Sequence, residues 1–236
     1  MKRIVIFLFV AIVTLSAVSQ QSSSRPGKKR QNTTQAASGN KIGKTSGNKQ
    51  VVKKAKTDGR INGHRYIDLG LSVKWAACNV GAATPSDYGY YYAWGETSTK
   101  ARFTKDNSKT FQKAVGNIAG NTQFDAARAK WGGKWRMPTK AEMEELKTQC
   151  TWTWTTQGGH NGYKITGKNG NSIFLPAAGY RYKKGFKNVG ERGYYWCAMP
   201  YEKFKKFAYH FYFYSDCYTL DFDGRYYGNS IRPVIE

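Results

Sequence analysis

Cysteine can bind metals, take part in redox chemistry or form disulfides, and this chain has four cysteines: Cys78, Cys150, Cys197 and Cys217. No two of them have the two-residue spacing of a zinc ribbon or a thioredoxin-like redox motif, so neither kind of site is expected. An even number of cysteines in an exported protein favours two disulfides. Four cysteines allow three connectivities, and their spacing does not choose among these.

The histidines and carboxylates form no catalytic or metal-binding pattern. His64, His160 and His210 are scattered, without the i,i+4 spacing of paired metal ligands. We therefore expect no catalytic residue, no metal and no cofactor. A cysteine–histidine pair that only the fold brings together is the alternative. Turn and surface roles are expected for the C-terminal acidic cluster, which consists of Asp216, Asp221 and Asp223.

The strongest signal for binding is aromatic and lies late in the chain. Tyrosine offers rigid, amphipathic contact area at low entropic cost, and its ring stacks on sugar rings. We expect this part of the chain to recognise a protein or glycan ligand, with burial in an ordinary aromatic β core as the alternative. The expected ligand-binding residues are Tyr195, Trp196, Tyr201, Tyr209, Tyr212, Tyr214, Tyr218, Arg225, Tyr226 and Tyr227.

Residues 1–19 have the three-part pattern of a secretory signal peptide. Lys2 and Arg3 precede the apolar run Ile4–Val18, and the small residues of Ala17-Val18-Ser19 predict cleavage directly after them. The run is shorter than the roughly 20 residues that a spanning helix needs, although an uncleaved anchor is the alternative. We expect an exported protein, periplasmic, cell-surface or secreted, that is not transmembrane after signal cleavage.

Charge and composition divide the rest of the chain in two. Residues 20–58 contain ten basic residues, one acid and no aromatic ring, so we expect a disordered basic linker. Residues 59–236 are expected to form one folded domain, and they still carry 26 basic against 14 acidic residues. This charge favours anionic surface polymers as partners, with a solvated basic face as the alternative. Export makes a specific nucleic-acid partner unexpected.

Strand patterns dominate the folded part. Asn169-Gly170 and Asp223-Gly224 tolerate positive φ, and each predicts a tight hairpin turn. Thr139-x-x-Glu142 predicts a capping box that opens a helix over 140–149, and a shorter helix is expected over 124–130. Two short helices among many strands predict an α+β fold with mainly antiparallel sheet. The expected strands are 64–69, 73–77, 90–94, 162–166, 172–175, 207–213 and 218–222.

Period-two alternation assigns the side chains of the strand expected at 207–213 to two faces. Burying both faces would require hydrogen-bond partners for many phenol groups, so some rings are expected to face solvent. One face would carry Phe207, Tyr209, Phe211 and Phe213, and the other His210, Tyr212 and, just beyond the strand, Tyr214.

Eight short runs, several of them rich in Trp, Gly or Pro, are spread over about residues 62–235. They are Tyr66-Ile-Asp-Leu-Gly-Leu-Ser-Val-Lys-Trp75, Asn79-Val-Gly-Ala82, Tyr92-Ala-Trp-Gly-Glu96, Trp131-Gly-Gly-Lys-Trp-Arg-Met-Pro-Thr139, Cys150-Thr-Trp-Thr-Trp154, Gly170-Asn-Ser-Ile-Phe-Leu-Pro-Ala-Ala-Gly179, Gly193-Tyr-Tyr-Trp196 and Ser230-Ile-Arg-Pro-Val234. In this order the chain closely resembles the Fibrobacter succinogenes major paralogous domain, a family abundant in exported proteins of Bacteroidota.

The resemblance implies a C-type-lectin-like fold of the formylglycine-generating-enzyme type. In such a fold the late loops form the ligand face, and residues 231–234 would be a closing strand paired near the N-terminal one. The run from Trp135 to Met143 looks like the Arg-Leu-Pro-Thr-Glu-Ala-Glu-Trp signature of that superfamily. The calcium-binding motifs of sugar-binding C-type lectins are absent.

The cysteine context of formylglycine-generating enzymes is also absent, because neither Cys197 nor Cys217 matches it. The sequence therefore predicts a non-enzymatic, ligand-binding or adhesion-type module. A diverged enzyme of this type and a polyanion-binding surface protein are the alternatives. A Cys197–Cys217 disulfide is the simpler interpretation, because both cysteines lie beside expected strands twenty residues apart. Cys78 would then pair with Cys150.

Overall fold

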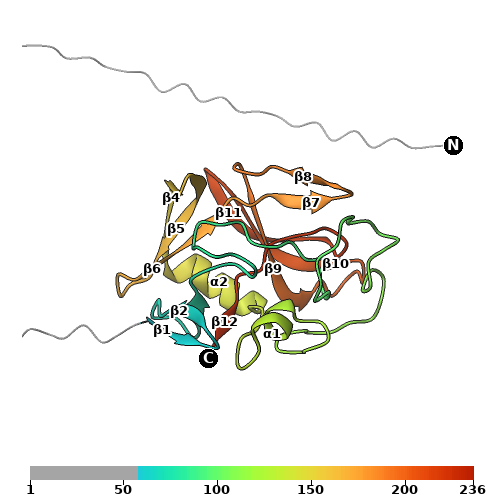
Figure 1. Cartoon of the computed structure of the whole chain (residues 1–236), viewed down its shortest axis with the longest axis horizontal. Coiled ribbons are helices and arrows are strands. Elements are labelled where there is room, and N and C mark those ends of the chain that lie inside the picture. Colours follow the sequence, from blue (N-terminus) through green and yellow to red (C-terminus); the bar gives the residue numbers. More distant parts are fainter. Residues whose placement is uncertain (1–57) are drawn as a thin grey trace, which may run out of the picture. The chain divides into compact units, whose positions relative to one another are not determined.

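The structure is a computed structural model that describes residues 58–236 (Figure 1). The expected signal peptide and linker therefore lie outside the described residues, apart from Asp58. This residue is not part of a linker, because it begins the first strand. Within the described part of the chain, no helix has the length and apolar character needed to cross a membrane.

The described residues form an α+β fold of mainly antiparallel strands with two short helices, as the sequence predicts. A long irregular segment, 77–125, separates the first three strands from the helices. In chain order the elements are β1 (Asp58–Ile61), β2 (His64–Ile67), β3 (Lys74–Ala76), α1 (Ala126–Trp131), α2 (Lys140–Gln149), β4 (Thr151–Gln157), β5 (His160–Thr166), β6 (Ser172–Pro176), β7 (Tyr180–Tyr182), β8 (Gly185–Lys187), β9 (Gly193–Pro200), β10 (Phe207–Tyr214), β11 (Cys217–Gly224) and β12 (Val234–Ile235).

The strands pair into four small antiparallel sheets. Their strand orders are β1-β2-β3-β12, β11-β10-β9, β4-β5-β6 and β7-β8. In the first sheet Val234 of β12 lies opposite Trp75 of β3, so the last strand pairs with an early one. The closing strand was expected over 231–234, whereas β12 spans only Val234–Ile235. Figure 1 shows α2 between the sheets, where it packs against β9, β10 and β11.

Helix α2 begins where the sequence predicts. The Thr139 hydroxyl accepts a hydrogen bond from the Glu142 backbone N–H at 3.3 Å, and the Glu142 carboxylate accepts one from the Thr139 N–H at 2.8 Å. These two bonds make the capping box, which pairs otherwise unsatisfied N–H groups at the helix N-terminus. Met143 and Leu146 are buried on the face that packs on the sheets. Arg136 also holds Glu142 in an ion pair of 2.6 Å.

Two hydrophobic clusters make up most of the core. The first joins α2 to the sheets of β4–β6 and β9–β11 and includes the buried rings of Phe211 and Phe213. The second surrounds α1 and contains three fully buried indoles, those of Trp94, Trp135 and Trp196. Trp94 Nε1 donates to the Cys197 carbonyl at 2.9 Å, and Trp196 Nε1 donates to the Tyr92 carbonyl at 2.8 Å. The indoles therefore fix the irregular segment 77–125 against β9.

Two local predictions are wrong, and a third is correct only in outline. Residues 90–94 form no strand; their only ladder contact is an isolated bridge from Tyr92 to Asn229. Asp223-Gly224 is not a hairpin turn, because β11 extends through it and the β10–β11 turn lies at Ser215-Asp216. Asn169-Gly170 does lie in the β5–β6 hairpin, but its loop spans five residues, 167–171.

The buried side chain of Arg232 connects three parts of this fold. Its Nη1 donates to the carbonyls of Ala76 and Ala77 at 3.0 and 2.8 Å. Nη2 donates to the Phe174 carbonyl at 2.8 Å, and Nε donates to Asn79 Oδ1 at 2.9 Å. Burial lowers the pKa of this guanidinium, because a cation loses its hydration there. The four oxygen partners replace that hydration.

The first prediction concerns this arginine. Arg232→Met should lower the free energy of unfolding by about 3 kcal/mol or more, because it leaves four buried oxygens without a donor. Arg102→Met is the matched control, since Arg102 is exposed, and it should change stability by less than about 0.5 kcal/mol. Urea unfolding followed by tryptophan fluorescence measures both. Equal midpoints for the two variants would contradict the role given to Arg232.

Candidate ligand-binding face

The pairing register of β9, β10 and β11 decides which side chains share a face. Tyr212 lies opposite Tyr194 of β9, and His210 lies opposite both Trp196 of β9 and Asp221 of β11. Directly opposed residues of antiparallel strands point to the same side of the sheet. These side chains therefore form the outer face, while the buried Phe211 and Phe213 point to the core.

A continuous surface of tyrosine rings covers part of this outer face and extends over the β7–β8 hairpin. The ring centroids of Tyr180 and Tyr194 are 4.9 Å apart, and those of Tyr194 and Tyr212 are 5.0 Å apart. Tyr182 and Tyr227 are 5.3 Å apart. Aromatic pairs attract at these separations, so the rings support one another. We call this surface the tyrosine face; its members are Tyr180, Tyr182, Tyr194, Tyr212, Tyr214, Tyr226 and Tyr227.

Backbone hydrogen bonds hold the β7–β8 hairpin beside the sheet. The Gly179 N–H donates to the Arg192 carbonyl at 2.7 Å, and the Arg181 N–H donates to the Gly228 carbonyl at 2.7 Å. Gly179 has a φ of 63°, and a Cβ at this position would collide with the Lys187 carbonyl. Only glycine therefore allows the chain to turn this closely into β7.

Three cations lie over rings of the tyrosine face. Arg192 is 5.9 Å from the Tyr214 centroid, Lys183 is 5.6 Å from Tyr182, and Lys105 is 5.8 Å from Tyr226. Cations at these distances are attracted to the electron-rich ring faces and still keep their contact with solvent. The face thus combines phenol hydroxyls, apolar ring surface and positive charge at its edge.

Two titratable groups beneath the rings have strongly shifted pKa values. Burial lowers the pKa of His210 to about 4, so its imidazole is neutral at pH 7, and its Nδ1 has no hydrogen-bond partner. Burial raises the pKa of Asp223 to about 6. Burial also raises the pKa of Tyr227. All three shifts disfavour the charged form. Because His210 is neutral at pH 7, it adds no positive charge beneath the rings, and the positive charge at this surface comes from its edge.

The structure brings together four of the ten expected ligand-binding residues, namely Tyr212, Tyr214, Tyr226 and Tyr227. Three of the others are enclosed and require correction. Tyr195 points to the core and donates to the Pro176 carbonyl, and Trp196 lies in the second hydrophobic cluster. Arg225 packs over Trp94 at 4.3 Å and donates to the carbonyls of Phe207, Thr110 and Lys113.

The remaining three expected residues lie on the opposite side of the sheet. Tyr218 stacks on Trp152 at 4.7 Å. Tyr209 and Tyr201 belong to an aromatic group at the other end of β10. The alternation predicted over 207–213 is therefore correct, but one ligand surface cannot include both of its faces.

Three members of the tyrosine face are missing from the sequence-based set. Tyr180 and Tyr182 lie on β7, a three-residue strand among glycines and lysines that carries no strand pattern of useful length. Tyr194 lies one residue before the predicted Tyr195 and faces the other way. Neighbouring strand residues alternate in direction. Because Tyr195 faces the core and bonds a core carbonyl, Tyr194 must face outward.

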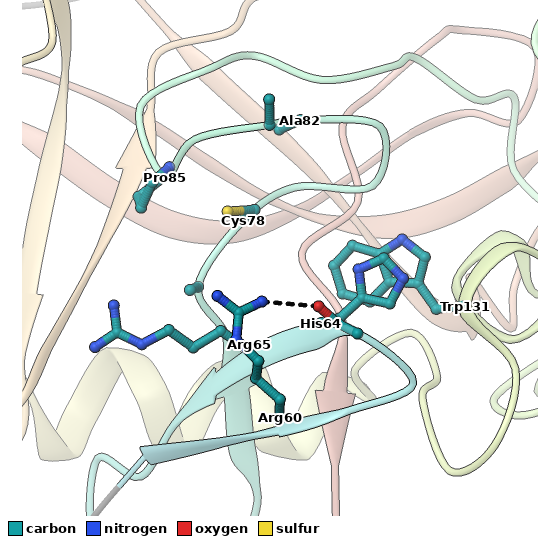
Figure 2. A pocket seen from close by; sticks show the side chains of 10 residues that line it. Arg60, His64, Arg65, Cys78, Ala82, Pro85 and Trp131 are labelled. Carbon is teal, nitrogen blue, oxygen red and sulfur yellow. Dashed lines mark hydrogen bonds between the residues drawn. The ribbon is translucent and has the colours of Figure 1, made fainter.

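A separate hollow of about 220 Å³ lies between β2, the segment after β3 and α1 (Figure 2). Figure 2 shows His64 stacked on Trp131, with ring centroids 3.8 Å apart, and Arg60 donating to the Gly63 carbonyl at 2.9 Å. Cys78 also lines the hollow. Burial raises the pKa of its thiol, so the sulfur is protonated at neutral pH and a weak nucleophile.

All four cysteines are free thiols, which corrects the expected disulfides. A Cys197–Cys217 bond is excluded by register, because β10 separates their strands. Cys217 lies opposite Tyr214, while Cys197 lies next to Trp196, which is opposite His210. Tyr214 and His210 are four residues apart on β10, so the two cysteines are offset by roughly 13 Å along the strands, far beyond the span of a disulfide.

Two of the other thiols are also protonated at neutral pH. Burial raises the pKa of Cys150 to about 11 and raises that of Cys197 as well. No group of three His, Cys, Asp or Glu side chains that could hold a metal ion occurs within residues 58–236.

No known protein family, curated protein or solved structure matches the chain.

The second prediction follows from the two buried titratable groups. An unfolded histidine binds a proton below about pH 6.5, whereas folded His210 does so only near pH 4. Between these values the unfolded state binds more protons, so acidification should lower the free energy of unfolding, by about 3 kcal/mol at most. His210→Gln should remove this loss in denaturant titrations between pH 7 and 4.

Asp223 acts with the opposite sign and provides the matched comparison. Its folded pKa of about 6 exceeds the unfolded value, so the folded state binds more protons between pH 6 and 4. Protonation of Asp223 therefore stabilises the folded state as the pH falls, and this stabilisation is lost as the pH rises. Asp223→Asn should therefore steepen the acid loss that His210→Gln flattens. Parallel pH profiles of the two variants would contradict the assignment.

Proposed function

We propose that this protein is an exported, non-enzymatic ligand-binding or adhesion-type module whose tyrosine face recognises a protein or glycan. The observation that carries the proposal is the chain of ring contacts from Tyr214 through Tyr194 to Tyr226. Four of the seven tyrosines of the face come from the sequence-based set. Tyr214 is 37 % exposed, and the other rings are half-buried apart from the more enclosed Tyr194.

Rings that are held in place but only partly covered are suited to recognition. Their neighbours restrict rotation, so little conformational entropy remains to be lost on binding. Their uncovered areas offer apolar stacking surface, and their hydroxyls offer hydrogen bonds. A glycan would place the apolar side of a sugar ring on a tyrosine, and a protein would place a flat side chain or a peptide bond there.

The proposed fold is C-type-lectin-like, of the type implied by the resemblance to the Fibrobacter succinogenes major paralogous domain. The mainly antiparallel architecture and the closure of β12 on β3 support it. The proposed location is outside the cytoplasm, on the strength of the N-terminal sequence pattern. In this arrangement the segment after β6 and strands β7–β11 would provide the ligand face, as late loops do in that fold.

Binding to a polyanion is the second candidate function, because cations surround the tyrosine face. Arg192, Lys183 and Lys105 would contact an acidic glycan at the same time as the rings. Added salt distinguishes the two candidates. Binding driven by counterion release weakens steeply with ionic strength, whereas stacking on tyrosine rings does not.

The third prediction tests the tyrosine face. Tyr212→Ala and Tyr226→Ala should each weaken binding to hits from a glycan and protein array by about tenfold. Tyr90→Ala is the control, because Tyr90 is 56 % exposed but lies outside the tyrosine face, and its affinity should stay within a factor of two. Retained binding in both face variants would contradict the assignment of the tyrosine face as the ligand-binding surface, whichever ligand class the array returns.

The fourth prediction separates binding from cysteine chemistry. Without reductant, unfolding in urea should expose four titratable thiols. In the folded protein at pH 7, Cys197 should resist iodoacetamide, because it is buried and burial raises its pKa. Array binding should survive alkylation of the accessible thiols. A turnover that alkylation abolishes would instead support the diverged-enzyme alternative.

A further inference from the structure

A second exposed aromatic surface lies on the other side of the β9–β11 sheet. Phe204 is 54 % exposed and Phe222 is 40 % exposed, which places both among the exposed large hydrophobic side chains of residues 59–236. They belong to the turn between β9 and β10 and to the neighbouring part of β11. We call residues 201–207 together with Phe222 the aromatic–lysine loop.

The exposed rings of this loop are held by their neighbours. Tyr201 stacks on Phe222 with centroids 4.0 Å apart and an interplanar angle of 14°. Phe204 lies 6.2 Å from Tyr201 and 6.3 Å from Phe207. The Phe207 N–H closes the turn by donating to the Phe204 carbonyl at 3.0 Å. Phe204 therefore stands at the tip of a supported turn.

The charges around these rings are mostly positive. Lys203, Lys205 and Lys206 are all exposed, and the Lys206 ammonium lies 5.8 Å from the Phe204 centroid. The loop contains a single acid, Glu202, and its carboxylate accepts a hydrogen bond from the Tyr209 hydroxyl at 3.0 Å. Lys140 adds a fourth cation, 4.2 Å from the Tyr209 centroid.

We propose that the aromatic–lysine loop binds the surface of an anionic lipid bilayer. A protruding phenylalanine ring fits the boundary between lipid headgroups and acyl chains, and the adjacent lysines fit the lipid phosphates. A dissolved anion would use the lysines but would leave Phe204 and Phe222 in water. The bilayer covers both parts of the surface, which favours it over free phosphate.

This surface and the tyrosine face lie on opposite sides of one sheet. Register places Phe222 opposite Tyr209, on the side of Phe211 and away from Tyr212. A protein attached to a membrane through the loop would therefore keep the tyrosine face accessible. The inference does not rest on the proposed function, and either can fail alone.

The fifth prediction uses vesicle co-sedimentation of the protein, with all variants sharing the same N-terminus. Wild type should bind vesicles of 30:70 phosphatidylglycerol and phosphatidylcholine and should bind pure phosphatidylcholine at least tenfold more weakly. Phe204→Ser should reduce binding to the anionic vesicles about tenfold. Lys205→Glu should reduce it by a similar factor, since each lysine at such a surface contributes roughly fivefold. Both positions are exposed, so the fold should be retained.

Matched variants separate the loop from general effects of charge and exposed aromatic area. Lys164→Glu makes the same change in net charge at an exposed position on β5, and Tyr90→Ser removes an equally exposed ring elsewhere. Both should bind the anionic vesicles within twofold of wild type, and so should Tyr212→Ala. Inorganic phosphate at matched ionic strength should not compete.

Three outcomes would overturn the inference. The first is absence of wild-type binding to the anionic vesicles. The second is an equal loss in Lys205→Glu and Lys164→Glu, which would indicate attraction by net charge alone. The third is displacement by inorganic phosphate, which would indicate a site for the free anion. None of these results bears on the array binding predicted for the tyrosine face.

Discussion

The guanidinium of Arg232 is the constraint on which the arrangement of the sheets depends. Its charge lies where water is excluded, so each of its N–H groups needs an oxygen partner. The acceptors come from the end of β3, from Asn79 and from β6. Asn79 in turn donates to the Tyr195 hydroxyl at 3.2 Å, which extends the network to β9. The C-terminal segment, two sheets and the strand behind the tyrosine face are thereby fixed together.

The same sheet uses aromatic rings for two different purposes. On its inner side Phe211 and Phe213 pack with Trp152, and this burial contributes stability. On its outer side Trp196 is covered by the irregular segment 77–125, while Tyr212, on the same side, remains half-exposed. Coverage by other segments, and not residue type, decides which rings stabilise the fold and which remain available for contact.

The parts of the fold that local chemistry specifies could be predicted from the sequence. The capping box at Thr139 fixed the start of α2, and alternation over 207–213 gave the two faces of β10. The burial of Tyr195 and Arg225 could not be predicted, because it depends on partners that are distant in the chain. Asp223-Gly224 has the residues of a primed turn, but the pairing of β10 with β11 overrides that preference. The tyrosine face was only partly predictable, because β7 carries too few residues for a pattern.

The β7–β8 hairpin is attached through main-chain contacts at Gly179, Arg181 and Lys183, the last of which exchanges two hydrogen bonds of 2.9 Å with Phe103. Such contacts are the same for almost any side chain at the intervening positions. Mutation can therefore replace the displayed rings during evolution while the architecture persists. Under the proposed function, substitutions at a few codons would therefore change the specificity of the face without changing the framework that holds it.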